Sequence, residues 1–156
     1  MNFPVTYKSG STSDTEHIGE ELAKSILSNA SLPRFVALYG DLGVGKTAFT
    51  RGFTQVVAPS ARVKSPTFAL VNQYKGDGIS VFHFDMYRIE DEDELYSIGF
   101  FDYLDMGICL CEWSENIEPS LPEEYIRAEI IKDDPKNTDS RIIKLSIVKS
   151  TAGGAQ

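Results

Sequence analysis

Two segments near the start of the chain carry regularly spaced apolar residues. Ile18, Leu22 and Ile26 recur at helical spacing after residues 13–16, which have the Ser-x-x-Glu form of a capping box. This pattern predicts a helix over residues 14–28. Residues 35–39 form a short, uninterrupted apolar run that ends at Gly40, which is typical of a buried strand.

The middle of the chain alternates between helical and strand patterns. A second helix is expected to open near Lys46, because apolar residues recur on one face as far as Val57 and Pro59 follows. Residues 68–74 and 79–84 predict a hairpin, since the four residues between them include two glycines. The acidic run 90–94 favours a solvated helix start over a functional acidic surface. Residues 108–111 predict a central strand that ends at Glu112.

The end of the chain predicts a second hairpin, with strands over residues 125–131 and 141–148. Residues 150–156 are small and polar and are expected to form a frayed tail. With 156 residues, 42% of them apolar and 24% charged, the chain fits one globular domain over residues 1–156.

Composition limits the location and the partners. The N-terminus lacks the apolar core of a secretion signal, and no stretch is long and apolar enough to span a membrane, so we expect a cytoplasmic protein without membrane contact. A net charge of −8 argues against strong direct binding to nucleic acid, so any RNA would be held by a partner. Cys109 and Cys111 are interpreted as small core residues, with a redox or metal pair as the alternative.

Residues 40–47 match the phosphate-binding pattern G-x-x-x-x-G-K-[ST] and lie between a predicted strand and a predicted helix. Glycines let backbone N–H groups curl around a phosphate, and the helix N-terminus adds a partial positive charge. Lys46 is expected to bridge the β- and γ-phosphates, and Thr47 to place its hydroxyl on Mg²⁺. The expected nucleotide contacts in this loop are Asp41, Leu42, Gly43, Val44, Gly45, Lys46 and Thr47.

A P-loop site also needs an acidic group near the metal, usually at the carboxyl end of a neighbouring strand. Asp85 and Glu112 each follow a predicted strand, and either one could be the metal ligand. Thr67 is the candidate sensor of the γ-phosphate, although Pro66 could equally set only an extended entry to the strand. His83 could orient Asp85 or a water molecule, or fill the core.

Several motifs together resemble the TsaE (YjeE) family, the bacterial ATPase component of tRNA threonylcarbamoyladenosine biosynthesis. The resemblance covers most of the chain and is far more specific than a P-loop alone. The motifs are residues 40–47, Ser65-Pro66-Thr67-Phe68, Leu70-Val71, His83-Phe84-Asp85-Met86-Tyr87-Arg88, Gly99, Asp102-Tyr103, Glu112-Trp113 and Leu121-Pro122. This chain departs from the family at Ser114, where many members carry Pro.

The resemblance implies an α/β fold of the P-loop NTPase type, with three layers and a mixed, mainly parallel central sheet flanked by helices. It implies Mg²⁺ and ATP as cofactors, ADP as product, and action with TsaB and TsaD on the adenosine at position 37 of tRNA. By position, Thr47 and Glu112 correspond to the magnesium ligands and Asp85 to a second essential carboxylate. Lys46, Asp85, Glu112 and Thr67 are therefore the catalytic candidates. The N-terminal segment lies near the adenine in that family, so Thr12 to Thr15 are expected to border the base, with Thr12 as the candidate contact.

Three other functions remain open at this stage. A GTPase could use the same P-loop, although no Asn-Lys-x-Asp motif for reading guanine is present. A small-molecule kinase usually carries an Arg-rich lid, whereas the six Arg residues here are spread widely along the chain. Nothing in the sequence excludes a nucleotide-dependent interaction module with little hydrolysis.

Overall fold

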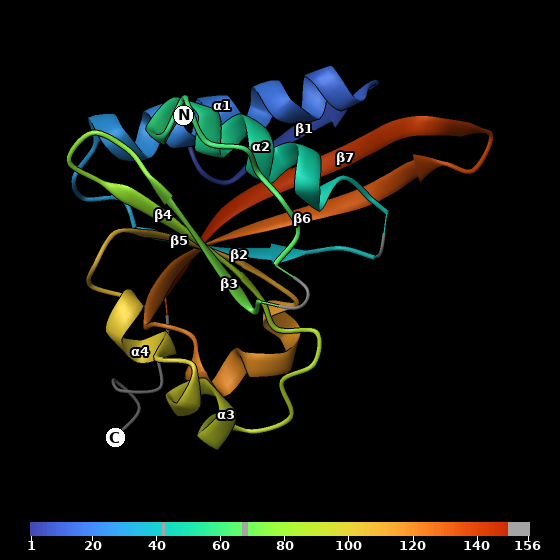
Figure 1. The fold of residues 1–156 in the computed structure, drawn as a ribbon. Coiled ribbons are helices and arrows are strands. Elements are labelled where there is room, and N and C mark those ends of the chain that lie inside the picture. Colours follow the sequence, from blue (N-terminus) through green and yellow to red (C-terminus); the bar gives the residue numbers. More distant parts are fainter. Residues whose placement is uncertain (42, 67–68, 150–156) are drawn as a thin grey trace.

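A computed structural model describes residues 1–41, 43–66 and 69–149. It contains seven strands, four α-helices and one 3-10 helix, η1, in these ranges (Figure 1). In chain order they are β1 Val5–Ser9, α1 Thr12–Ser28, β2 Phe35–Tyr39, α2 Lys46–Val57, β3 Val71–Lys75, β4 Ser80–Asp85, α3 Glu92–Ser97, α4 Phe100–Tyr103, β5 Ile108–Glu112, η1 Ser114–Ser120, β6 Glu124–Asp134 and β7 Asn137–Lys149.

The strands form one sheet in the order β1-β7-β6-β2-β5-β4-β3. Strand β2 pairs in parallel with both β5 and β6, and β4 pairs in parallel with β5. Strands β3 and β7 run antiparallel to their neighbours, so β1, β2, β4, β5 and β6 all point the same way. The expected mixed, mainly parallel sheet is confirmed.

Helices cover both faces of this sheet and complete three layers (Figure 1). Helices α1 and α2 bury their apolar faces, including Leu22 and Phe49, against one side of β2 and β5. Helices α3, α4 and η1 lie on the other side, where Phe100 packs edge-on against Phe84. Strand β2 is buried at all five positions because both of its faces are covered.

Two glycines allow α1 and α2 to cross closely. A Cβ atom at Gly52 would collide with the backbone carbonyl oxygen of Glu16, and one at Gly19 would collide with that of Phe49. Because α2 begins at Lys46, inside the phosphate-binding pattern of residues 40–47, this contact fixes the helix that carries the end of that pattern.

Most of the predicted elements are present, with some corrections at their ends. The cap of α1 is Ser11, whose hydroxyl accepts a hydrogen bond from the Asp14 N–H at 3.0 Å, so the prediction that residues 13–16 form the cap was wrong. Strand β3 begins later than predicted, because Leu70 has a left-handed backbone with φ of 67° and its N–H is bonded to Pro66. The sequence patterns missed β1, α4 and η1, which are short. The predicted frayed tail lies outside the described residues.

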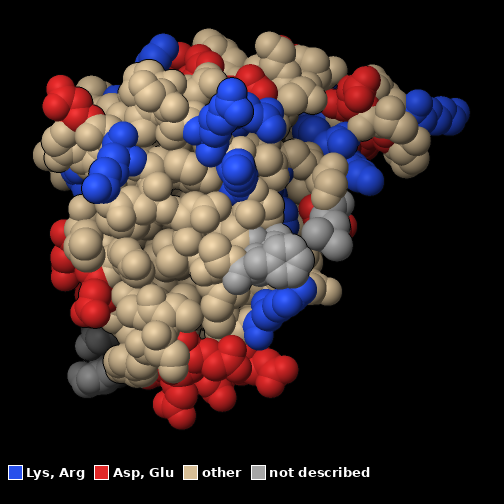
Figure 2. All heavy atoms as spheres, viewed as in Figure 1, with Lys and Arg blue, Asp and Glu red and all other residues tan. Residues whose placement is uncertain are grey.

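The acidic run does form a solvated helix start, as predicted. Asp91 is the cap of α3, and its carboxylate accepts the N–H of Glu94 at 3.0 Å. Figure 2 shows Asp and Glu side chains gathered at the end of the molecule where Figure 1 places α3, while Lys and Arg lie mainly over the face that carries α2. Within the described ranges, no helix has the length and apolar character needed to cross a membrane.

Candidate functional site

Three parallel strands bring their carboxyl ends to the same edge of the sheet. Strand β2 leads into the P-loop, β4 ends at Asp85, and β5 ends at Glu112. The register pairs Glu112 with Leu38 on one side and with Asp85 on the other. Residues that are 27 or more positions apart in the sequence therefore become neighbours because the strands between them are in register.

The P-loop adopts a conformation that depends on its glycines. Gly40, Gly43 and Gly45 have φ angles of 149°, 74° and 119°, values that other residues rarely adopt. Gly45 is the N-cap of α2 and offers no side chain to the first N–H groups of the helix. Those N–H groups and the helix dipole favour an anion at this position.

Lys46 is folded back onto the protein in this structure. Its Nζ donates a hydrogen bond to the Gly40 carbonyl oxygen at 2.8 Å and lies 4.3 Å from the centre of the Trp113 ring. Only 5% of Lys46 is exposed. The ammonium group is therefore held at the mouth of the loop by one hydrogen bond and one cation–π contact.

A cavity of about 280 Å³ lies between the P-loop and the ends of β4 and β5. Of the predicted site residues, Gly43, Gly45, Lys46, Thr47, Asp85 and Glu112 all line it, together with Ser65 and Trp113. The Thr47 hydroxyl and the Asp85 and Glu112 carboxylates are hard oxygen ligands of the kind that Mg²⁺ takes, so these residues fit the ion. Leu42 and Thr67 lie outside the described residues.

The two carboxylates are held differently. Glu112 accepts a hydrogen bond from His83 Nε2 at 2.6 Å, while Asp85 Oδ1 accepts the backbone N–H of Tyr87 at 2.9 Å. His83 is fully buried, and its Nδ1 has no hydrogen-bond partner among the described residues. The sequence predicted that His83 would orient Asp85 or a water molecule, or fill the core, and it did not predict a contact with Glu112. In the structure His83 supports the carboxylate of Glu112 at the end of β5.

The loop after β5 turns sharply at Trp113, which has a left-handed backbone with φ of 58°. The Ser114 hydroxyl then donates a hydrogen bond to the Cys111 carbonyl oxygen at 2.7 Å, and η1 begins at this residue. Ser114 thus starts the 3-10 helix. The Tyr87 and Trp113 rings pack 4.9 Å apart beside the cavity.

A smaller hollow, of about 100 Å³, adjoins the other side of the P-loop. It is bordered by the start of α1, including Thr12 and Thr15, and by Asp139 and Arg141 from β7. Thr12 therefore lies beside the P-loop residues Gly43, Val44 and Gly45, which line the same hollow. Arg141 was missed by sequence reasoning because it lies 97 positions from Val44 and belongs to no recognisable motif.

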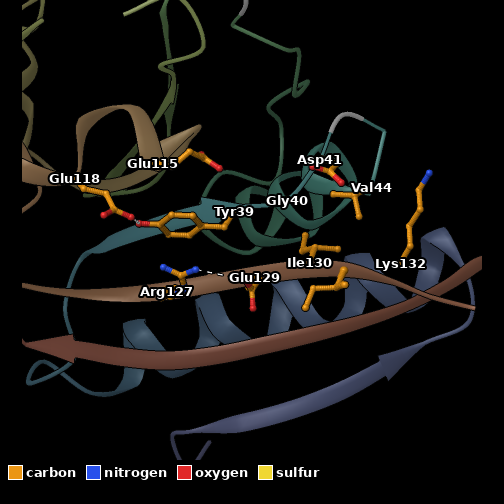
Figure 3. A pocket seen from close by; sticks show the side chains of 11 residues that line it. Tyr39, Gly40, Asp41, Val44, Glu115, Glu118, Arg127, Glu129, Ile130 and Lys132 are labelled. Atoms are coloured by element: carbon orange, nitrogen blue, oxygen red, sulfur yellow. Dashed lines mark hydrogen bonds and ion pairs between the residues drawn. The ribbon is translucent and has the colours of Figure 1, made fainter. Parts of the chain in front are cut away.

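A third hollow, of about 660 Å³, lies behind the P-loop between β6 and η1 (Figure 3). Tyr39 lies on one side of the hollow, between Glu118 and Arg127 (Figure 3). The Arg127 guanidinium carbon lies 3.8 Å from the centre of the Tyr39 ring, and the Tyr39 hydroxyl donates to Glu118 at 3.4 Å. Burial, followed by the neighbouring Tyr125 and Glu118, raises the pKa of Tyr39 above its ordinary value. Asp41 lines this hollow and not the cavity beside Lys46, so its side chain is separated from the predicted metal ligands.

Both cysteines are fully buried and free, as expected for small core residues. They pack in the same apolar cluster as Phe82 and Phe100, on the side of the sheet covered by α3 and α4. Burial raises the pKa of the Cys109 thiol to about 12 and raises that of Cys111 further. Neither thiol is poised for redox chemistry, because the reactive thiolate is disfavoured.

Comparisons with known proteins agree with the motifs. Residues 9–143 match the family model of the threonylcarbamoyl adenosine biosynthesis protein TsaE. A Haemophilus influenzae protein described as "tRNA threonylcarbamoyladenosine biosynthesis protein TsaE" is 45% identical over 106 residues, which are 67% of this chain and 67% of that protein. The Bacillus subtilis protein of the same description is 41% identical over 96 residues, 61% of this chain and 60% of its own length.

A solved structure shares the fold. The crystal structure of Bacillus subtilis YdiB superposes with a TM-score of 0.71 and 26% sequence identity, covering 97% of this chain and 89% of the other. The likeness therefore extends over nearly the whole chain, including the hairpin of β6 and β7.

Proposed function

The chain belongs to the TsaE family of threonylcarbamoyl adenosine biosynthesis proteins, and from that premise we propose that it binds and hydrolyses Mg-ATP to support threonylcarbamoyladenosine modification of tRNA. The observation that supports the nucleotide chemistry most directly is the single cavity that joins Lys46 and Thr47 to Asp85 and Glu112. A phosphate cradle and two carboxylates at neighbouring strand ends are the parts that phosphoryl transfer requires.

The roles follow from where each side chain is held. The Thr47 hydroxyl and the Glu112 carboxylate would hold Mg²⁺, which neutralises charge on the phosphates when bound. Glu112 is suited to this because its hydrogen bond to His83 fixes the orientation of its carboxylate. Asp85, held by the Tyr87 N–H, would orient the attacking water or a water on the metal.

Binding requires Lys46 to move. Its ammonium group would leave the Gly40 carbonyl and the Trp113 ring and turn toward the β- and γ-phosphates. Thr67 remains our candidate for sensing the γ-phosphate, and Thr12 for bordering the base.

We also propose that hydrolysis is slow in the isolated protein and faster in a complex with TsaB and TsaD, which would hold the tRNA. Among the described residues that line the phosphate cavity, Lys46 is the one with a positive charge. Phosphoryl transfer depends mainly on positioning and charge stabilisation, so a site with one cation can bind ATP and yet turn over slowly. The net charge of −8 is also unsuited to holding tRNA directly.

Steady-state hydrolysis of ATP and GTP, measured with and without TsaB and TsaD at saturating Mg²⁺, tests this proposal. We expect preference for ATP, acceleration by the partners, and loss of the accelerated rate in Lys46→Ala. Equal rates with and without partners would refute partner activation. Preference for GTP would indicate a GTPase, and phosphorylation of a small metabolite would indicate a kinase. Nucleotide binding without hydrolysis in any condition would indicate an interaction module.

A further inference from the structure

Arg141 connects strand β7 to the P-loop. Its Nε donates a hydrogen bond to the Val44 carbonyl oxygen at 2.7 Å. Its Nη1 donates to two further carbonyl oxygens, those of Thr138 at 2.7 Å and Ser140 at 2.9 Å. One guanidinium group therefore joins the middle of the P-loop to the tip of the β6–β7 hairpin.

The contact determines which way one peptide unit of the P-loop faces. A trans peptide is planar, so the Val44 carbonyl and the Gly45 N–H point in opposite directions. Arg141 and Val44 line the smaller hollow and not the phosphate cavity, which Gly45 lines, so the bond from Arg141 keeps the Val44 carbonyl on the side of the smaller hollow and leaves the Gly45 N–H on the opposite side. The preceding N–H, that of Val44, is already bonded to the Asp41 carbonyl at 3.3 Å.

This orientation matters because of charge. A carbonyl oxygen that faced the cavity would repel a phosphate, whereas an N–H group attracts it. Gly45 has a left-handed φ of 119° and no side chain, so neither sterics nor packing of its own side chain fixes the peptide. Arg141 supplies the restraint that glycine lacks.

Arg141 is itself held firmly. Its backbone is in the interior of the sheet, opposite Ser9 of β1 on one side and Lys132 of β6 on the other. The Ser9 hydroxyl in turn forms a 2.7 Å hydrogen bond with that of Thr15 at the start of α1. The guanidinium group is a rigid fork that can serve three carbonyls at once, which a lysine ammonium on a flexible stem matches poorly.

We propose that Arg141 is a positioning residue of the nucleotide site: it fixes the Val44–Gly45 peptide so that the P-loop is preorganised for phosphate. The effect on nucleotide affinity rests on the proposed function of the site. The effect on the conformation of the loop does not, since the contact joins two residues of the chain itself.

The test uses the full chain with Arg141→Gln and Arg141→Lys, and with Lys144→Gln as a matched control. Lys144 lies on the same strand, is exposed, and is not among the described residues that line the hollows beside the P-loop. Hydrogen–deuterium exchange of the P-loop in the absence of nucleotide reports its preorganisation, and calorimetric titration with Mg-ADP and with pyrophosphate reports affinity. The unfolding midpoint of each variant reports global stability.

We expect both Arg141 variants to exchange faster at the P-loop and to bind ADP and pyrophosphate about tenfold more weakly, by similar factors. Lys144→Gln should match the wild type in every measurement. Weaker binding of ADP with unchanged binding of pyrophosphate would overturn the proposal, because it would place Arg141 on the base or ribose. A lysine variant equal to the wild type would also overturn it, since charge alone would then suffice.

The outcomes separate the two proposals. If the wild type binds neither ligand, the proposed function fails, while the exchange experiment still decides whether Arg141 holds the loop. Unaltered exchange at the P-loop in the Arg141 variants would sink the inference even if ATP binding is confirmed. If the variants do not fold, the Arg141 Nε–H of the wild type can be observed by NMR with labelled arginine. Rapid exchange of that proton with solvent would overturn the proposal that it is bonded to the Val44 carbonyl.

Discussion

Lys46 must give up two contacts to reach a phosphate, and this exchange sets the size of the effect expected from Lys46→Ala. In the structure its ammonium group is bonded to the Gly40 carbonyl and lies 4.3 Å from the Trp113 ring centre. A hydrogen bond between charged groups contributes about 1.5–3 kcal/mol, and a bridge to two phosphates provides more than one. Two contacts are given up in return: the hydrogen bond to the Gly40 carbonyl, of about 1.5–3 kcal/mol, and the cation–π contact, of about 2 kcal/mol for a buried ammonium group.

We expect a tenfold or greater rise in the Kd for Mg-ATP in Lys46→Ala, about 1.4 kcal/mol or more, because bonds to two charged phosphate groups are stronger together than one carbonyl bond and one ring contact. Turnover should fall further than affinity, because the same ammonium group would stabilise charge that develops in the transition state. The folded structure should persist, since alanine is a good helix former at the first position of α2.

Trp113 provides a direct assay, because it is the single tryptophan of the chain. ATP should change its fluorescence in the wild type as Lys46 leaves the ring, and Lys46→Ala should change it before any nucleotide is added. Titration calorimetry measures the Kd independently. Lys24→Ala, at an exposed residue of α1 that pairs with Glu21 at 3.6 Å, serves as the control. Unaltered affinity and turnover in Lys46→Ala would refute the assignment of the P-loop.

Three further predictions concern other parts of the molecule. Glu112→Gln should weaken the Mg²⁺ dependence of nucleotide binding, whereas Asp85→Asn should lower turnover with nucleotide still bound. Titrations of nucleotide across Mg²⁺ concentrations and single-turnover assays measure these effects, and the opposite phenotypes would mean that the two roles are reversed. Gly52→Ala should lower the free energy of unfolding by about 1–3 kcal/mol, measured by urea denaturation, because its Cβ would strike the Glu16 carbonyl; a stabilised variant would contradict the close crossing of α1 and α2. Burial raises the pKa of Cys109 to about 12, so this thiol should resist alkylation at pH 9 in the native protein and react quickly in urea. The free energy of unfolding should also fall as the pH rises above about 8.5, because only the thiol of the unfolded chain ionises there. Rapid alkylation of the native protein would argue against that burial.

Much of the fold could be predicted from the sequence because local patterns match it. Residues 35–39 are β2 to the residue, and the helix predicted to open near Lys46 is α2. These segments combine strong periodicity with clear punctuation by Gly and Pro. Strand β1 was missed because its sequence, Val-Thr-Tyr-Lys-Ser, is not an uninterrupted apolar run like that of the equally short β2. Helix α4 was missed because four residues are too few for a helical period to emerge. Both elements pack against partners distant in the sequence, β1 against β7 and α4 in the aromatic cluster.

The sequence by itself determined the chemistry that is local: the P-loop, whose glycines, lysine and threonine are adjacent in the chain, and the carboxylates that follow two strands. Motifs spread over most of the sequence also indicated the family. Only the tertiary structure decided what meets across the chain: His83 with Glu112, Trp113 with Lys46, and Arg141 with Val44. The reason is physical, since each of these contacts depends on strand order and register, which are set by the packing of the whole sheet and leave no signature at either residue.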